Sequence, residues 1–102
     1  MRWVNIHPET GEPTNDQRAQ WARLALSAYT VETYPGRTFE DIEADMAGIE
    51  NGDDYSAVQD LLTNLLHLVT LRGWNIDELL RAARFNHTVE LDQEADAANA
   101  AE

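Results

Sequence analysis

The chain has 102 residues, 43% of them hydrophobic, and this length predicts one domain with a modest core. Nineteen acidic residues oppose seven basic ones and give a net charge of −12, so direct binding to nucleic acid or anionic lipid is not expected. The absence of cysteine excludes disulfides and thiolate metal sites, and no apolar run approaches the roughly 20 residues that a bilayer requires. Because the opening residues also lack the apolar core of a signal peptide, we expect a soluble, cytoplasmic protein.

Residues 1–14 are expected to form an extended N-terminal arm. Pro8, Gly11 and Pro13 oppose a long helix there, and Trp3 and Ile6 are predicted to pack the arm on the rest of the protein. Residues 15–92 are expected to form a single helical domain. Residues 93–102 are acidic and rich in alanine and are expected to form a tail.

A first helix is predicted from Asn15, because Thr14 and Gln17 have the spacing of a capping box. Pro35 and Gly36 end it. Five apolar residues recur along it at helical spacing and form one stripe: Trp21, Leu24, Ala25, Ala28 and Val31.

A second, short amphipathic helix is predicted after Thr38, which has Asp41 at the capping position. Its apolar residues follow one another at three- and four-residue steps: Phe39, Ile42, Met46 and Ile49. Gly48 and the Asn51-Gly52 pair close the segment.

The remainder predicts an antiparallel helix pair, at about 54–72 and 76–92. Acidic residues favour the start of the first helix, Gly73 stops it, and Asn75 with Glu78 caps the second. Five residues on facing stripes are predicted to be buried together: Leu62, Leu65, Leu66, Leu80 and Ala83. His87 falls on the same inner stripe and is expected to be buried and hydrogen-bonded. The expected fold is therefore an all-α bundle of three to four helices.

Several short segments of the sequence are similar to segments of other proteins. They are Arg18-Ala19-Gln20-Trp21-Ala22-Arg23 with Ala25-Leu26, then Ala57-Val58-Gln59-Asp60-Leu61-Leu62 with Leu65-Leu66-His67, then Gly73-Trp74, and finally Ala83, His87 and Glu90. With these blocks the chain resembles, from Asn15 onward, a set of small helical proteins encoded by actinobacteria and their phages. That resemblance implies a phage or a mobile element in a GC-rich host, and it implies no particular activity.

Glu40-x-x-Glu43 followed by Asp60 is similar to a second family, the MazG-type nucleoside triphosphate pyrophosphohydrolases. Those enzymes are all-helical and hold Mg²⁺ with ExxE on one helix and ExxD on another. The chain departs from the pattern because Ala57 stands where the second motif needs glutamate. In place of a lysine, one of three arginines would have to meet the triphosphate: Arg72, Arg81 or Arg84.

Polar residues on the last two predicted helices form a speculative cluster. Asp60, Asn64 and His67 lie at i, i+4 and i+7, and His87 and Glu90 lie one turn apart. Residues of these types bind Zn, Mn or Fe. The first stripe points away from the leucine face, however, so we favour a solvated polar stripe and expect no bound metal.

The middle of the chain is strongly acidic and carries no base between residues 40 and 54. The acids of this run form a candidate interaction face, which consists of Glu40, Asp41, Glu43, Asp45, Glu50, Asp53 and Asp54. Such a run is typical of a solvated surface. The alternative is that its carboxylates imitate DNA phosphates and occupy the groove of a basic nucleic-acid-binding protein.

No residue pattern supports nucleophilic catalysis: cysteine is absent, as are the Gly-x-Ser-x-Gly motif and a phosphate-binding glycine loop. We expect neither catalytic residues nor a cofactor. The expected function is a non-catalytic protein–protein interaction or regulatory accessory role, with a host or phage protein as partner. Trp74 and Phe85 are the candidate apolar contacts, and homodimerisation is an alternative use of the leucine-rich faces. The two rivals are an acidic DNA mimic and a degenerate MazG-like pyrophosphohydrolase.

Overall fold

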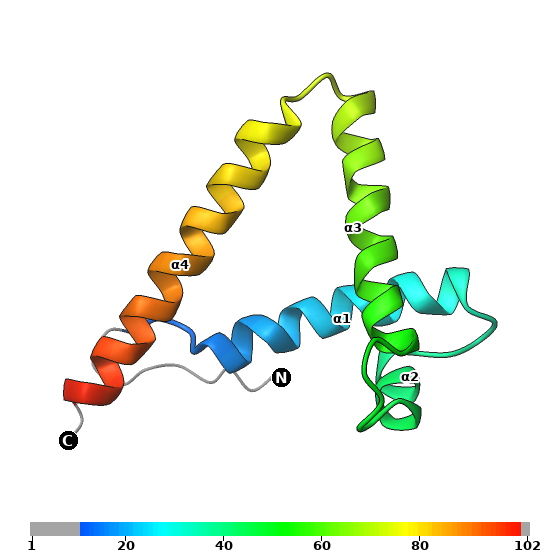
Figure 1. Ribbon diagram of the computed structural model, residues 1–102, viewed down its shortest axis with the longest axis horizontal. Coiled ribbons are helices and arrows are strands. Elements are labelled where there is room, and N and C mark those ends of the chain that lie inside the picture. Colours follow the sequence, from blue (N-terminus) through cyan, green and yellow to red (C-terminus); the bar gives the residue numbers. More distant parts are fainter. Residues whose placement is uncertain (1–10, 101–102) are drawn as a thin grey trace. The chain divides into compact units, whose positions relative to one another are not determined.

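The computed structural model describes residues 11–100, with side chains as far as residue 96, and the fold of this part is all-α, as predicted (Figure 1). The described helices are α1 (Asn15–Thr33), α2 (Phe39–Asp45), α3 (Asp53–Leu71) and α4 (Ile76–Ala100). Among them, none combines the length and the apolar character needed to span a bilayer. Most of the predicted N-terminal arm lies outside the described residues.

Two compact units make up the chain. The central unit is Trp21–Trp74 and contains most of α1, all of α2 and all of α3. The terminal unit joins Met1–Gln20 with Asn75–Glu102, and so contains the first turns of α1 and all of α4.

The helices begin where side chains can cap them. The hydroxyl of Thr14 accepts the N–H of Gln17 at 3.1 Å, and Asn75 Oδ1 accepts the N–H of Glu78 at 2.9 Å. Each bond satisfies one of the backbone donors that a helix start leaves open. Both predicted starts are confirmed. The helix that follows Asn75 continues through the acidic, alanine-rich stretch to Ala100.

Helix α2 begins with the predicted capping box. Thr38 Oγ1 accepts the N–H of Asp41 at 3.2 Å, and Asp41 Oδ2 accepts the N–H of Thr38 at 3.1 Å. The helix is shorter than its apolar pattern suggests, because it ends at Asp45 and Met46 is already its C-cap. Ile49 therefore lies beyond the helix and is 55% exposed.

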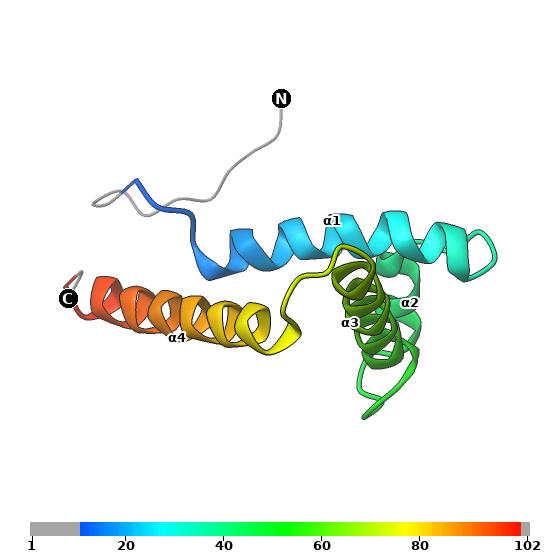
Figure 2. The ribbon, with the colours of Figure 1, turned by 90° about the horizontal axis from the view of Figure 1, so that it is seen from above.

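The core of the central unit lies where α1, α2 and α3 meet. Leu26 of α1, Phe39 of α2 and Ala57 of α3 are buried together, and Tyr34 and Leu61 pack against them. Figures 1 and 2 show α2 beside the N-terminal half of α3, which the contacts between these helices confirm. The small side chain of Ala57 is completely buried in this core.

This core differs from the predicted one. Leu62 and Leu65 keep 54% and 45% of their surface exposed, Ala83 is exposed, and Leu66 and Leu80 are half-buried. Successive residues of a helix are rotated by about 100°, so Leu62 and Leu65 lie on a different side of α3 from Ala57. It is the Ala57 side that α1 and α2 cover.

The apolar stripe of α1 also faces away from the core. Trp21, Leu24 and Val31 are 40–47% exposed, and the alanines between them are exposed as well. The side that packs inward carries Leu26 and Thr30 instead. Thr30 is fully buried, and its hydroxyl donates to the carbonyl of Ser27 at 3.2 Å, so burial leaves this polar group satisfied.

In the terminal unit, the start of α1 is bonded to the C-terminal half of α4. The backbone N–H of Asn15 donates to Glu94 Oε1 at 2.9 Å, and its side-chain amide donates to the carbonyl of Glu90 at 3.2 Å. Arg18 Nε forms an ion pair with Glu90 Oε2 at 2.8 Å. The prediction that His87 is buried is wrong: it is exposed, because these contacts reach α4 at Glu90 and Glu94.

Candidate functional site

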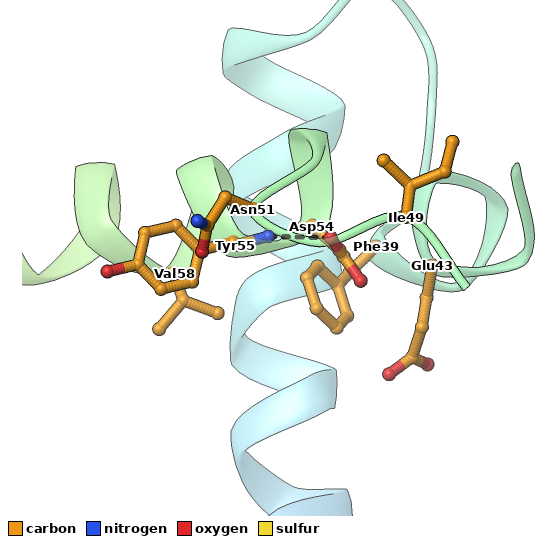
Figure 3. Close-up of a pocket in the computed structure, with 7 residues that line it drawn as sticks. All are labelled: Phe39, Glu43, Ile49, Asn51, Asp54, Tyr55 and Val58. Carbon is orange, nitrogen blue, oxygen red and sulfur yellow. Dashed lines mark hydrogen bonds between the residues drawn. The ribbon is translucent and has the colours of Figure 1, made fainter. Parts of the chain in front are cut away.

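The candidate site is a hollow of about 370 Å³ in the central unit, beside the segment that links α2 to α3 (Figure 3). It is lined by Phe39, Glu43, Ile49, Asn51, Asp54, Tyr55 and Val58. Its residues come from α2, from the connecting loop and from the first turns of α3.

The loop that forms one side of the hollow depends on two residues with special backbone roles. Asn51 has a φ of 55°, in the left-handed region that asparagine tolerates better than most residues. Gly52 follows, and a Cβ added there would lie 2.9 Å from Met46 Sδ. A side chain at residue 52 would therefore require the Met46 side chain, next to the end of α2, to shift.

The lining combines apolar and acidic groups. Ile49 and Tyr55 expose 55% and 58% of their surface, whereas Phe39 is almost completely buried and forms part of the floor. The carboxylates of Glu43 and Asp54 lie at its edge, as Figure 3 shows. A hollow of this kind suits a segment that presents an aliphatic or aromatic side chain next to a basic group.

Ser27 connects the hollow to α1. Its hydroxyl accepts the N–H of Phe39 at 3.3 Å and donates to the carboxylate of Glu40. This hydrogen bond, followed by one from the backbone, holds the pKa of Glu40 below its usual range. Glu40 therefore positions the first turn of α2, although the sequence pattern placed it on an interaction face.

Other acids of that predicted face are also engaged within the protein. Arg23 forms an ion pair with Glu43 at 3.2 Å, and Arg37 forms one with Asp45. Asp41 belongs to the capping box of α2, and backbone and side-chain hydrogen bonds at Thr38 lower its pKa.

The three acids nearest α3 differ from the others. Asp53 and Asp54 stand in the first turn of α3, where a negative charge complements the helix dipole. Glu50 and Asp53 are exposed and Asp54 is half-buried. Of these three acids, only Asp54 lines the hollow.

The polar stripe of α3 meets two tyrosines whose role the sequence pattern did not reveal. Tyr34 donates its hydroxyl to Asp60 Oδ2 at 3.2 Å, and Asn64 donates its amide to the Tyr29 hydroxyl at 2.6 Å. Asp60 and Asn64 thus bind the end of α1, while Asp60, Asn64 and His67 all stay exposed, as expected of a solvated stripe. The only signal in the sequence was a pair of tyrosines near the predicted end of the first helix.

The residues of the speculative polar cluster are divided between the two units. Asp60, Asn64 and His67 belong to the central unit, whereas His87 and Glu90 belong to the terminal unit. His67 is exposed, and Glu90 is paired with Arg18. Within residues 11–96, no three His, Asp or Glu side chains form a group that could hold a metal ion.

The residues of the MazG-like pattern have structural roles as well. Glu40, Glu43 and Asp60 interact with Ser27, Arg23 and Tyr34 respectively. The position that would need a second-motif glutamate holds Ala57, which is fully buried in the core.

Of the three candidate arginines for triphosphate, Arg72 belongs to the central unit and Arg81 and Arg84 belong to the terminal unit. The guanidinium of Arg72 stacks over the ring of Trp74, 4.9 Å from its centroid. Arg81 and Arg84 line a shallow hollow of about 440 Å³ on α4, together with Asp77 and Leu80.

The two predicted apolar contacts are both at the surface. Trp74 is 52% exposed and Phe85 is 65% exposed. Comparisons of the chain with models of protein families, with curated proteins and with solved structures found no match. The resemblances to actinobacterial and phage proteins and to MazG-type enzymes therefore stay predictions from the sequence.

Proposed function

We propose that this chain is a non-catalytic interaction protein that acts in the cytoplasm as an accessory of a phage or mobile element in an actinobacterial host. Its partner is a host or phage protein. The observation that carries the proposal is the hollow between α2 and α3, with apolar residues on its floor and carboxylates at its edge.

The chemistry of the lining defines the partner segment. A volume of about 370 Å³ accommodates one or two large side chains, and ligand pockets begin at about 300 Å³. Ile49 and Tyr55 offer exposed apolar surface to such side chains. The carboxylate of Asp54 favours lysine or arginine next to it, and the net charge of −12 attracts a basic partner from a distance.

A DNA mimic would need its carboxylates free to meet a basic groove. Four of the seven acids on the candidate face are engaged by neighbouring side chains or by the cap of α2: Glu40, Asp41, Glu43 and Asp45. This distribution supports local recognition at the hollow over an extended array of charges.

The test is a peptide array in which aliphatic or aromatic residues are combined with basic, neutral or acidic neighbours. Peptides with an apolar residue beside lysine or arginine should bind best, and their binding should weaken as salt concentration rises. Ile49→Gln removes apolar lining without changing charge, so it should weaken binding at every salt concentration. Asp54→Asn should mainly flatten the dependence on salt.

The matched control is Glu50→Gln, which introduces the same side chain one position further along the loop, outside the hollow. It should retain the peptide preference of the unaltered protein. Equal binding by the Ile49→Gln and Glu50→Gln variants would contradict the proposal, as would an array without any preference for basic, apolar peptides.

A further inference from the structure

Arg23 compensates one of the two carboxylates at the edge of the hollow (Figure 3). Its Nε donates to Glu43 Oε2 at 3.2 Å, and so joins α1 to α2 across 20 positions of the chain. The two side chains are 35% and 39% exposed, so a ligand in the hollow can still reach this ion pair. Because the two charges cancel, the α2 side of the hollow is nearly neutral.

Asp54, on the α3 side of the hollow, has no such compensation. Its Oδ1 accepts the N–H of the next residue, Tyr55, at 2.8 Å, but the ion pairs formed within residues 11–96 all involve other acids. Asp53 precedes it, so the start of α3 carries two negative charges against roughly half a positive charge from the helix dipole. The hollow is therefore negative on its α3 side and nearly neutral on its α2 side.

We infer, on the basis of the proposed function, that Arg23 determines the specificity of the hollow by limiting it to segments with a single basic residue. The base of such a segment lies at Asp54, while the neighbouring apolar side chain packs on Phe39 and Ile49. A second base on the α2 side meets Glu43 already paired with Arg23, and a neutral pair offers it no net attraction.

A ligand does not readily take the place of Arg23. The ion pair with Glu43 is intramolecular, so it forms without the loss of translational freedom that a ligand must overcome. A lysine or arginine brought to Glu43 would also lie beside the guanidinium of Arg23 and be repelled by it. Removing Arg23 should therefore create a second position for a base, and the gain in affinity should be about two- to fivefold, as for an exposed ion pair.

Nuclear magnetic resonance titration of the full chain with short peptides, blocked at both ends, measures this preference. Each peptide contains a phenylalanine, with lysine on its N-terminal side, on its C-terminal side, on both sides or on neither. A charge-matched peptide keeps the adjacent lysine that binds better and carries its second lysine several residues away. The backbone amide signals of Asn51, Tyr55 and Val58 report binding at the hollow.

The unaltered protein already tests the inference, without any variant. One adjacent lysine should tighten binding, and the doubly basic peptide should bind no better than the charge-matched one, because its second lysine acts only through the net charge of −12. A doubly basic peptide that binds at least about twofold more tightly than the charge-matched one would overturn the inference and leave the proposed function standing. If no peptide shifts the signals of the hollow, the proposed function and the inference are both overturned.

Arg23→Gln leaves Glu43 unpaired and should change the specificity. The doubly basic peptide should then bind about two- to fivefold more tightly than the charge-matched one. Arg37→Gln is the matched control, because it alters the net charge equally but releases Asp45, which does not line the hollow. It should keep the specificity of the unaltered protein. No gain with Arg23→Gln, or an equal gain in both variants, would contradict the inference.

Adding Glu43→Gln to Arg23→Gln distinguishes a change of specificity from a change of fold. Glu43 is the carboxylate that Arg23→Gln releases, so the double variant should lose the new preference and bind the doubly basic and charge-matched peptides equally. If the preference persists without Glu43, Arg23 acts by holding α2 in place and not through this carboxylate, and the inference is overturned.

Discussion

Tyr34 donates its hydroxyl to Asp60 across 3.2 Å and so ties the residue that follows α1 to the first half of α3. Burial of the phenol, and then this hydrogen bond to a carboxylate, raises the pKa of Tyr34. The two residues are 26 positions apart in the sequence.

Replacing Tyr34 tests how much this hydrogen bond contributes to the stability of the protein. Tyr34→Phe should lower the free energy of unfolding by about 0.5–1.5 kcal/mol, measured by denaturant titration at neutral pH. Because the folded-state pKa is raised, the contribution of the bond is complete below the ordinary tyrosine pKa and is lost as pH rises through the raised value. The variant should therefore lose less stability than the unaltered protein on the alkaline side. Tyr55→Phe, at a residue 58% exposed, is the control. It should change neither the free energy of unfolding at neutral pH nor the loss of stability at alkaline pH.

Ser27 and Glu40 predict an effect on the acidic side. The folded protein lowers the pKa of Glu40, so this carboxylate stabilises the fold above its ordinary pKa and ceases to do so as pH falls through the lowered value. Ser27→Ala removes the first cause of the shift. An NMR titration should show the pKa of Glu40 moving up towards the ordinary range, while that of Asp41, which is held by Thr38, stays low. A parallel change at both carboxylates would instead indicate that α2 has loosened.

The location of the core is tested by two isoleucines. Ile42 is fully buried, and Ile42→Ala should lower the free energy of unfolding by about 2–5 kcal/mol. Ile49→Ala makes the same chemical change at a residue 55% exposed and should cost less than about 1 kcal/mol. Similar losses in the two variants, measured by chemical denaturation, would be incompatible with the described packing.

Asn51 should tolerate glycine better than alanine. Its φ of 55° disfavours a residue with a Cβ and no locally bonding side chain, so Asn51→Ala should destabilise the protein by about 1 kcal/mol. Asn51→Gly should be close to neutral, because glycine enters this region freely. The melting temperatures of the two variants, measured by thermal denaturation, make the comparison. A lower melting temperature for Asn51→Gly than for Asn51→Ala would contradict the described turn.

The acids of α2 should affect stability more than those of the loop. Neutralising Glu40, Glu43 and Asp45 together removes interactions with Ser27, Arg23 and Arg37, and should lower the melting temperature. Glu50→Gln changes an exposed carboxylate of the connecting loop and should leave the melting temperature nearly unchanged. If the first variant loses a partner, that loss reports a weakened α2, and Asp54→Asn, at a residue that lines the hollow, is the test of charge recognition.

The ends of the helices could be predicted because their causes are local. Thr38 and Asp41 are three residues apart, so a capping box is visible in the sequence itself. Gly73, with a φ of 73°, likewise marks the end of α3 by its own conformational freedom. These signals need no knowledge of what the helix packs against.

The side of each helix that faces the core could not be predicted in this way. Periodicity finds the stripe of Trp21 and Leu24 but does not say whether a neighbouring helix covers it, and in the structure the inward residues of α1 are Leu26 and Thr30. The hollow was missed for the same reason. Phe39, Asn51 and Asp54 were assigned to a helix face, a turn and an acidic run, and only the fold brings them around one space.

The sequence separations of the contacts have a consequence for the order in which the chain folds. Within the central unit the described side-chain hydrogen bonds join residues at most 35 positions apart, as in Tyr29 and Asn64. The terminal unit must bring Asn15 to Glu94, across 79 positions. Closing the longer loop costs only about 0.7 kcal/mol more, so the difference affects timing more than stability. During synthesis the central unit can fold once Trp74 has emerged, whereas the first turn of α1 must wait for nearly the whole of α4.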